Sequence, residues 1–341
     1  MENIQMVLIH DLNKKMQQDI LNGMFSDTLP SIRLLAQKYN VGTSTMKLSL
    51  KRLKEDGFLT GHQGKCIHVN PLAAGNHFFK KNIVLFIKLH RLQQMLYARV
   101  IESLRSTFET NGANIHLINS IQQLKSCDFE VDIIIATETK GEELQFITEN
   151  FPAEKIIQLN GYGQNYTNVG TDNFLAGYES VKYLHEGKKH KYIGILSMYL
   201  DYAVSFNKFR RDGANEYCRQ HPDVKLYEVD AENFDSVDAA IENLFSQNQN
   251  ITAIFATMDT LAFSVYSYAA KKKIAIPSQL ALLGFDNLSY CKFTIPPLTT
   301  YEEDSNSITE ALLKLTKNKL MEDMNIEQLI FPPVLINRES I

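Results

Sequence analysis

From residue 82 onward, apolar runs of four to six residues alternate with segments whose apolar residues recur at helical spacing. A strand covered on both faces is expected to be largely apolar, and such runs occur at 83–87, 115–118, 131–136, 156–159, 192–196, 224–229, 253–256 and 281–285. Amphipathic helices are predicted between them, near 96–111, 141–150, 173–186, 205–220, 235–247 and 259–271. The alternation predicts an α/β fold with two lobes in tandem, each built on a doubly wound parallel sheet. Such sheets bind ligands outside the carboxyl ends of their strands, so the cleft between the lobes is the expected ligand site.

The first 70 residues have a different pattern, in which helical spacing dominates. An opening helix over 4–22 is predicted by apolar residues at every fourth position: Ile4, Leu8, Leu12, Met16 and Ile20. Ser31 can cap a second helix, whose apolar face consists of Ile32, Leu35, Ala36 and Tyr39. That helix is expected to end at the turn 40–42, where a glycine tolerates positive φ.

A third helix and a hairpin complete this region. The helix can be capped by Thr43, Ser44 or Thr45; it buries Met46, Leu50 and Leu53, and its opposite face is polar and basic, with Ser44, Lys47, Lys51 and Lys54. Beyond Gly57, the runs 58–60 and 66–69 flank a cationic, glycine-rich tip at 61–65, which predicts a hairpin. A basic stripe alone is more often a solvated helix face. The order and spacing of all these parts nevertheless match a winged helix-turn-helix, which favours DNA binding.

Residues 4–70 resemble the gluconate-repressor (GntR) family of bacterial regulators. The resemblance is carried by Leu29, Pro30 and Ser31 with Arg33, by the helix VGTSTMKLSLKRL and by the wing GFLTGHQGK. It implies DNA contacts from the two helices and the wing, at Arg33, Thr43, Ser44, Thr45, Lys47, His62, Gln63 and Gly64. Thr43 and Lys47 stand where the family usually has arginine. Because lysine lacks the two-pronged geometry that reads guanine, we expect Lys47 to contact a phosphate.

Residues 82–338 resemble the effector domain of the lactose-repressor (LacI) family, which is built like the periplasmic sugar-binding proteins. The motifs that carry this resemblance are VGTDN at 169–173, Gly187 with His190, FRRDG at 209–213, IAIP at 274–277, LGFDN at 283–287 and IPPLTT at 295–300. A GntR-type head on such a domain resembles the arabinose repressors of some bacteria.

The second resemblance implies that Arg210 and Asp286 anchor the effector. Charged planar groups of this kind can make paired hydrogen bonds to sugar hydroxyls, while an aromatic face covers the C–H surface of the ring. Arg210 could instead form a surface ion pair with Asp212 or Glu216, and Asp286 could cap a helix.

Other candidate effector residues lie at neighbouring strand ends. Asp259 follows a strand and is either a ligand carboxylate or a helix cap. In the loop after the first strand, the candidates are His90, Arg91, Gln94 and Tyr97. The alternative is that this segment is only a solvated loop. Since the chain has no tryptophan, Phe206 or Tyr97 is the candidate stacking platform.

Length and charge agree with a DNA-binding first part followed by an effector-binding remainder. The 341 residues suggest two or three domains, which we place at 1–70 (DNA-binding), 71–81 (a linker broken by Pro71 and Gly75) and 82–341 (effector binding and dimerisation). Residues 1–75 hold nine Lys and Arg against six Asp and Glu, whereas the remainder holds 26 against 33. Only the first part is suited to a polyanion.

Few other chemistries are compatible with the sequence. Four scattered cysteines without zinc spacing indicate reduced thiols and no metal site, and the chain has no P-loop, dinucleotide fingerprint or nucleophile elbow. We expect no cofactor and no enzyme activity. The sequence predicts a cytoplasmic homodimeric regulator that binds operator DNA as a repressor and responds to a monosaccharide or its phosphate. The alternatives are a sugar- or nucleotide-processing enzyme with a regulatory head and a simple carbohydrate-binding protein.

Overall fold

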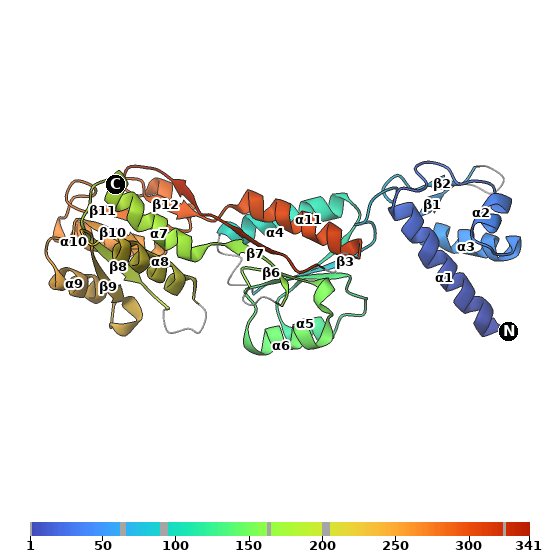
Figure 1. Cartoon of the computed structure of the whole chain (residues 1–341), viewed down its shortest axis with the longest axis horizontal. Helices are drawn as coiled ribbons and strands as arrows, with labels where there is room; N and C mark the ends of the chain where they lie inside the picture. Colours follow the sequence, from blue (N-terminus) through green and yellow to red (C-terminus); the bar gives the residue numbers. More distant parts are fainter. Residues whose placement is uncertain (1, 62–65, 89–94, 162–164, 200–204, 323–324) are drawn as a thin grey trace.

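The computed structural model describes residues 2–61, 66–88, 95–161, 165–199, 205–322 and 325–341. The chain forms three bodies in a row, which we call the head, the first lobe and the second lobe (Figure 1). Within these described residues no helix is both long enough and apolar enough to cross a membrane.

The head has the predicted three helices and hairpin. They are α1 (Glu2–Leu21), α2 (Ile32–Lys38), α3 (Thr43–Glu55) and the antiparallel pair β1 (Leu59–Thr60) and β2 (His68–Val69). Its core contains the predicted apolar residues from Leu12 onward, with Met16, Ile20, Leu35, Met46 and Leu53 almost completely buried.

The capping predictions for the head have different outcomes. Ser31 caps α2, since its Oγ accepts a hydrogen bond from the Leu34 amide at 3.4 Å. None of the three hydroxyls predicted to cap α3 does so: the helix already includes Thr43, and the cap position is Gly42, which has no side chain to bond with. The hydroxyl of Ser44 therefore remains exposed on the first turn of the helix.

The segment 71–81, which we predicted to be a linker, is packed between the head and the first lobe. Phe79 joins the core of the head and meets Phe58 edge-on at 5.2 Å. On the other side, the Asn76 side-chain amide donates to the Asn111 carbonyl at 2.8 Å, and the Lys80 amide donates to the Gly112 carbonyl at 2.8 Å. The segment is thus packed into the core of the head and hydrogen-bonded to the first lobe.

The first lobe is a six-stranded parallel sheet in the order β13-β7-β6-β5-β3-β4. Its strands are β3 (Asn82–Phe86), β4 (Asn114–Ile118), β5 (Ile133–Thr137), β6 (Ile156–Leu159), β7 (Thr167–Thr171) and β13 (Gln328–Phe331). Helices α4 (Met95–Thr110) and α11 (Ser305–Leu320) pack on one face. The other face is covered by α5 (Ile121–Lys125) and α6 (Gly141–Asn150) (Figure 1).

The second lobe has the same plan, with strand order β14-β12-β11-β10-β8-β9. These strands are β8 (Tyr192–Ser197), β9 (Lys225–Asp230), β10 (Ala253–Ala256), β11 (Ala281–Phe285), β12 (Thr299–Glu302) and β14 (Val334–Ile336), of which β14 runs antiparallel to β12. Helices α7 (Asn173–Lys182) and α8 (Phe206–Gln220) pack on one face. Helices α9 (Val237–Gln247) and α10 (Asp259–Lys272) pack on the other.

The lobes are interleaved along the chain, which differs from the predicted simple succession. The chain passes between them three times: from β7 to α7, from β12 back to α11, and from β13 to β14. Strands β7, β12, β13 and β14 and helices α5 and α11 were not predicted from the sequence. Strand β7 was not predicted because it lacks the continuous apolar run of the other strands: four of its five residues are Thr167, Asn168, Gly170 and Thr171.

Helices α7 and α8 approach each other closely through two glycines, and this contact fixes the start of α8. A Cβ on Gly177 would lie 1.6 Å from the Arg210 carbonyl oxygen, and a Cβ on Gly213 would lie 1.9 Å from the Phe174 carbonyl oxygen. Because both obstacles are backbone atoms, neither can rotate away. The glycines thereby determine how near Arg210 lies to the first turn of α7.

Gly177→Ala is expected to separate these helices and lower the free energy of unfolding by about 3 kcal/mol or more, the upper range for overpacking a core. Urea denaturation of the full chain measures the change. The control is Gly42→Ala, where the new Cβ meets no atom closer than 4.0 Å and a change within about 1 kcal/mol is expected. Equal effects of the two substitutions would contradict the close-packing argument.

Candidate DNA interface and effector cleft

The outer face of α3 presents small polar and cationic side chains at its amino-terminal end. Thr43, Ser44 and Lys47 are exposed, and Thr45 is partly exposed. Arg33 is exposed on α2. This arrangement suits a helix that enters the major groove with its first two turns, because hydroxyls and ammonium groups can bond to base edges and phosphates.

Two other lysines of the same stripe have partners within the protein. Lys51 lies 3.8 Å from Glu55, and the Lys54 ammonium donates to the Gly61 carbonyl at the start of the wing. Lys54 therefore helps to hold the hairpin against α3. The predicted wing residues His62, Gln63 and Gly64 lie outside the described residues, so their role stays a prediction.

Lys47→Ala is expected to weaken operator binding and to lower the slope of log K against log salt by about one unit, as expected when one phosphate contact is lost. Fluorescence anisotropy at several salt concentrations measures both quantities. Lys271→Ala, which removes a lysine paired with Asp238 on the second lobe, is the matched control. An unchanged slope in the Lys47 variant would remove this residue from the interface.

A cavity of about 280 Å³ lies where the two lobes meet. The first lobe contributes Asn160, Gly161, Asn168, Gly170 and Ile330, the second contributes Phe174, Phe206 and Phe209, and the crossing segment 171–173 lies between them. Its volume is just below the range of about 300–1,000 Å³ that is usual for small-molecule pockets. Phe206, the candidate stacking residue, is among its walls.

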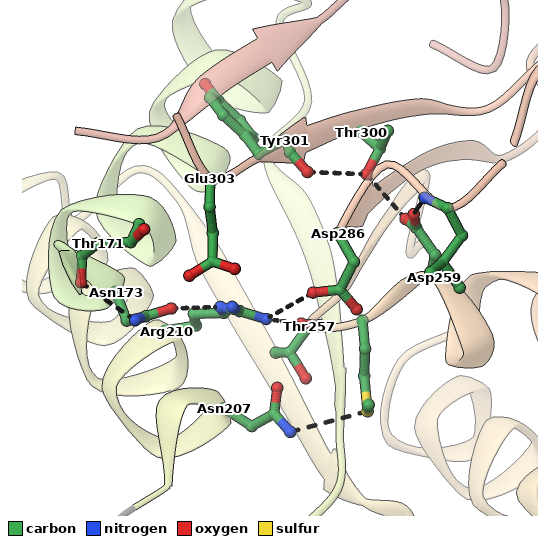
Figure 2. Close-up of polar contacts among 12 residues, drawn as sticks. Thr171, Asn173, Asn207, Arg210, Thr257, Asp259, Asp286, Thr300, Tyr301 and Glu303 are labelled. Atoms are coloured by element: carbon green, nitrogen blue, oxygen red, sulfur yellow. Dashed lines mark hydrogen bonds and ion pairs between the residues drawn. The ribbon is translucent and has the colours of Figure 1, made fainter. Parts of the chain in front are cut away.

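Arg210 is held inside the second lobe, with 5% of its side chain exposed, and it bonds to Asn173, which lines this cavity. Its Nε donates to Asn173 Oδ1 at 2.9 Å, and its Nη1 donates to the Thr257 carbonyl at 2.7 Å (Figure 2). The guanidinium also lies over the Phe285 ring, 3.5 Å from its centre. The alternative of a surface ion pair with Asp212 or Glu216 is wrong, because those carboxylates pair with Arg211 and Arg219.

Asp286 faces the same guanidinium, with Oδ1 3.6 Å from Arg210 Nη1 (Figure 2). It directly follows β11 at φ 112°, a conformation that L-residues rarely adopt, and 31% of its side chain is exposed. Burial raises the pKa of this carboxyl, and Asp259 raises it further, while Arg210 acts in the opposite direction. The alternative of a helix cap is wrong: the next helical turn begins only at Cys291.

Asp259 has a different place in the structure. It is fully buried at the first position of α10, and its oxygens accept hydrogen bonds from Thr300 Oγ1 at 2.7 Å, the Leu288 amide at 2.8 Å and Cys291 Sγ at 3.0 Å. The cap position belongs to Met258. Asp259 therefore ties β12 and the loop after β11 to α10, and we leave it out of the proposed contacts with ligand.

A polar network that the sequence analysis missed joins the lobes through Asn160 and Glu303. The Asn160 amide nitrogen donates to Glu303 Oε1 at 3.0 Å and to the Tyr97 hydroxyl at 3.1 Å, while its oxygen accepts from the Thr171 amide at 3.1 Å. Tyr97 in turn donates to Glu138. With 1% of its surface exposed, Tyr97 supports the junction and offers no open face for stacking.

Two signals in the sequence could have pointed to this network. Asn160 and Gly161 form an Asn-Gly pair directly after a predicted strand, and Asn160 has φ 52°, a conformation that asparagine tolerates better than most residues. Glu302, Glu303 and Asp304 form an acidic run directly after the IPPLTT motif. The candidates His90, Arg91 and Gln94 lie outside the described residues.

Burial raises the pKa of Glu303, against the opposing effects of Arg210 and the Asn160 hydrogen bond. An acid whose pKa is raised by folding resists ionisation in the folded state, so its contribution to stability falls as the pH rises above its ordinary value of 4.5. We expect Glu303→Gln to gain stability relative to the natural protein as the pH rises above 4.5.

Urea midpoints of both proteins across this pH range measure the difference. The control is Glu310→Gln, at an exposed position on the adjoining helix α11. Its urea midpoint should change with pH in the same way as that of the natural protein. If the urea midpoint of the Glu303 variant also changes with pH as that of the natural protein does, the carboxyl ionises as easily in the folded state as in the unfolded state.

The geometry defines a class of protein: a winged-helix DNA-binding transcription regulator with a two-lobed ligand-binding domain. The sequence agrees with this class. Residues 8–69 match the gntR family of bacterial regulatory proteins, and residues 181–341 match the periplasmic binding protein-like domain.

Curated relatives are regulators as well. The chain is 25% identical over 267 residues to the HTH-type transcriptional repressor PurR of Actinobacillus pleuropneumoniae serotype 3, covering 72% of this chain and 77% of the relative. It is 22% identical over 318 residues to the HTH-type transcriptional repressor CytR of Escherichia coli strain K12, covering 85% and 89%. The expectation that the protein is no enzyme is confirmed by these relatives.

The fold is also found among solved structures. A complex of the transcriptional regulator CelR with cellobiose matches with a TM-score of 0.64 and 16% identity, covering 92% of this chain and all of that chain. The predicted fold class is thereby confirmed. Among the described residues, no group of three or more His, Cys, Asp and Glu side chains is placed to hold a metal ion.

Proposed function

We propose that the protein is a homodimeric repressor of carbohydrate-metabolism genes and that a small sugar bound between its lobes releases it from operator DNA. The observation that carries this proposal is the Arg210–Asp286 pair, which is linked through Asn173 to a cavity to which both lobes contribute. Such a pair can orient hydroxyl groups, and Phe206 can cover the apolar face of a sugar ring. The matched CelR structure holds the sugar cellobiose, which supports this ligand class.

Ligand binding can change the angle between the lobes because both lobes hold parts of the site. Arg99 on α4 bonds to Glu302 on β12 at 3.1 Å, so helix α4 is connected to the second lobe. The carboxyl end of the same helix leads to Asn111 and Gly112, which hold the segment attached to the head. A closing movement at the cleft can therefore reach the head through α4. To change the protein from mostly bound to mostly free, the ligand must favour one state by about 5 kcal/mol.

Dimerisation is supported by an exposed apolar surface on the second lobe. Tyr290, Phe293 and Ile295 are 70%, 71% and 92% exposed within six residues of chain. Clustered exposed apolar residues of this size mark protein interfaces. Two copies related by a two-fold axis would present two heads to half-sites about one helical turn apart, or a multiple of it.

Asp286→Asn is expected to raise the dissociation constant for the sugar roughly 10- to 100-fold, the cost of losing a carboxyl group that bonds to the ligand, and to leave operator affinity unchanged. A thermal-shift screen of pentoses and hexoses, beginning with arabinose, identifies the ligand. Anisotropy on operator DNA then measures release. Asp212→Asn, which removes a carboxylate paired with Arg211, is the control.

Normal release of the Asp286 variant at the sugar concentration that suffices for the natural protein would contradict the assignment of this residue. If no sugar shifts the melting temperature and none releases DNA, the sugar effector itself is wrong. The head could then still bind operator DNA under the control of another ligand.

A further inference from the structure

The apolar and polar positions of α3 are exchanged at one point, where a leucine lies outside and a serine lies inside. Leu48 is 47% exposed and does not belong to the apolar core of the head, whereas Ser49 is fully buried. An exposed leucine alone is ordinary on a protein surface. Here it stands next to a buried polar residue, and such breaks in the local pattern are expected at functional sites.

Ser49 fixes the rotation of α3 about its own axis. Its hydroxyl donates to Asn13 Oδ1 on α1 and lies 3.7 Å from Met16 Sδ, and Asn13 is only 7% exposed. Turning the helix to bury Leu48 would break this bond and leave two polar groups unpaired in the core. That cost outweighs the gain from covering a leucine that is already half covered.

Leu48 lies in the middle of the candidate DNA-binding face of α3. Residues 44, 47, 48 and 51 are spaced i, i+3, i+4 and i+7, so they share one face of the helix, and all four are exposed. Because α3 begins at Thr43, Leu48 is in its second turn. In a helix-turn-helix the first turns of the second helix meet the base edges, so Leu48 would enter the major groove between Ser44 and Lys47.

We infer that Leu48 reads thymine by packing against its 5-methyl group in the major groove. This methyl group distinguishes thymine from the other bases, and apolar side chains contact it. Lys47 is expected to meet a phosphate, and a hydroxyl such as that of Ser44 pairs with several bases. Leu48 therefore supplies a sequence preference that these polar residues lack. The inference rests on operator binding and is independent of the effector.

Deoxyuridine tests the inference, because it lacks the methyl group of thymidine and keeps every hydrogen bond of the base pair. Operator DNA is first selected from a random duplex pool with the full-length protein. Each thymine of the selected half-site is then replaced in turn by uracil. Fluorescence anisotropy is expected to show a roughly 3- to 10-fold loss of affinity at one thymine of the half-site, the effect of one buried methyl group.

Leu48→Ala is expected to abolish this difference, so that the thymine and uracil duplexes bind the variant with equal affinity. Its melting temperature should stay unchanged, since alanine favours helix and Leu48 lies outside the core. The control is Leu34→Ala, which removes a leucine that is 59% exposed on α2. This variant should keep the full preference for thymine.

The inference fails if uracil binds as tightly as thymine at every position, or if Leu48→Ala keeps the preference of the natural protein. In both of those outcomes DNA binding by the head still stands. If the full-length protein selects no sequence from the pool, operator binding fails and the inference fails with it.

Discussion

The buried guanidinium of Arg210 is the constraint on which the junction of the lobes depends. A charge with only 5% of its side chain exposed is tolerated only when it is paired and hydrogen-bonded. Its partners come from three separate segments: Asn173 at the first crossing, Thr257 after β10 and Asp286 after β11. Because the guanidinium needs all of these partners, it holds the two strand ends and the start of α7 in fixed positions relative to one another.

The glycine contacts between α7 and α8 serve the same requirement at the level of the backbone. Any side chain at Gly177 would push away the carbonyl of Arg210, and the guanidinium would move with it. Asp259 plays the corresponding part on the other face, where it fastens the loop after β11 that presents Asp286. The site thus depends on packing at residues that never meet the ligand.

The parts of the fold that could be predicted from the sequence are those whose pattern is local. Strands such as 253–256 are continuous apolar runs, and the head has helical spacing throughout, so both were predicted with nearly correct bounds. Arg210 and Asp286 were found through family resemblance, and the structure places them 3.6 Å apart. The interleaving of the lobes was missed because it depends on β7 and β13, whose polar or half-exposed residues carry little strand signal. Asn160 and Glu303 were missed because they are 143 residues apart in the chain.

The packing of segment 71–81 bears on how far the head is an independent unit. Ala73 is fully buried and Phe79 is nearly so, both within the core that also contains Met16 and Leu53. A head cut at residue 70 would lack both side chains and leave apolar surface open to water. Exchange of heads between regulators of this design should therefore be made beyond Phe79. Lengthening this segment would move α3 away from the first lobe, because the segment connects the core of the head to Asn111 and Gly112 of that lobe.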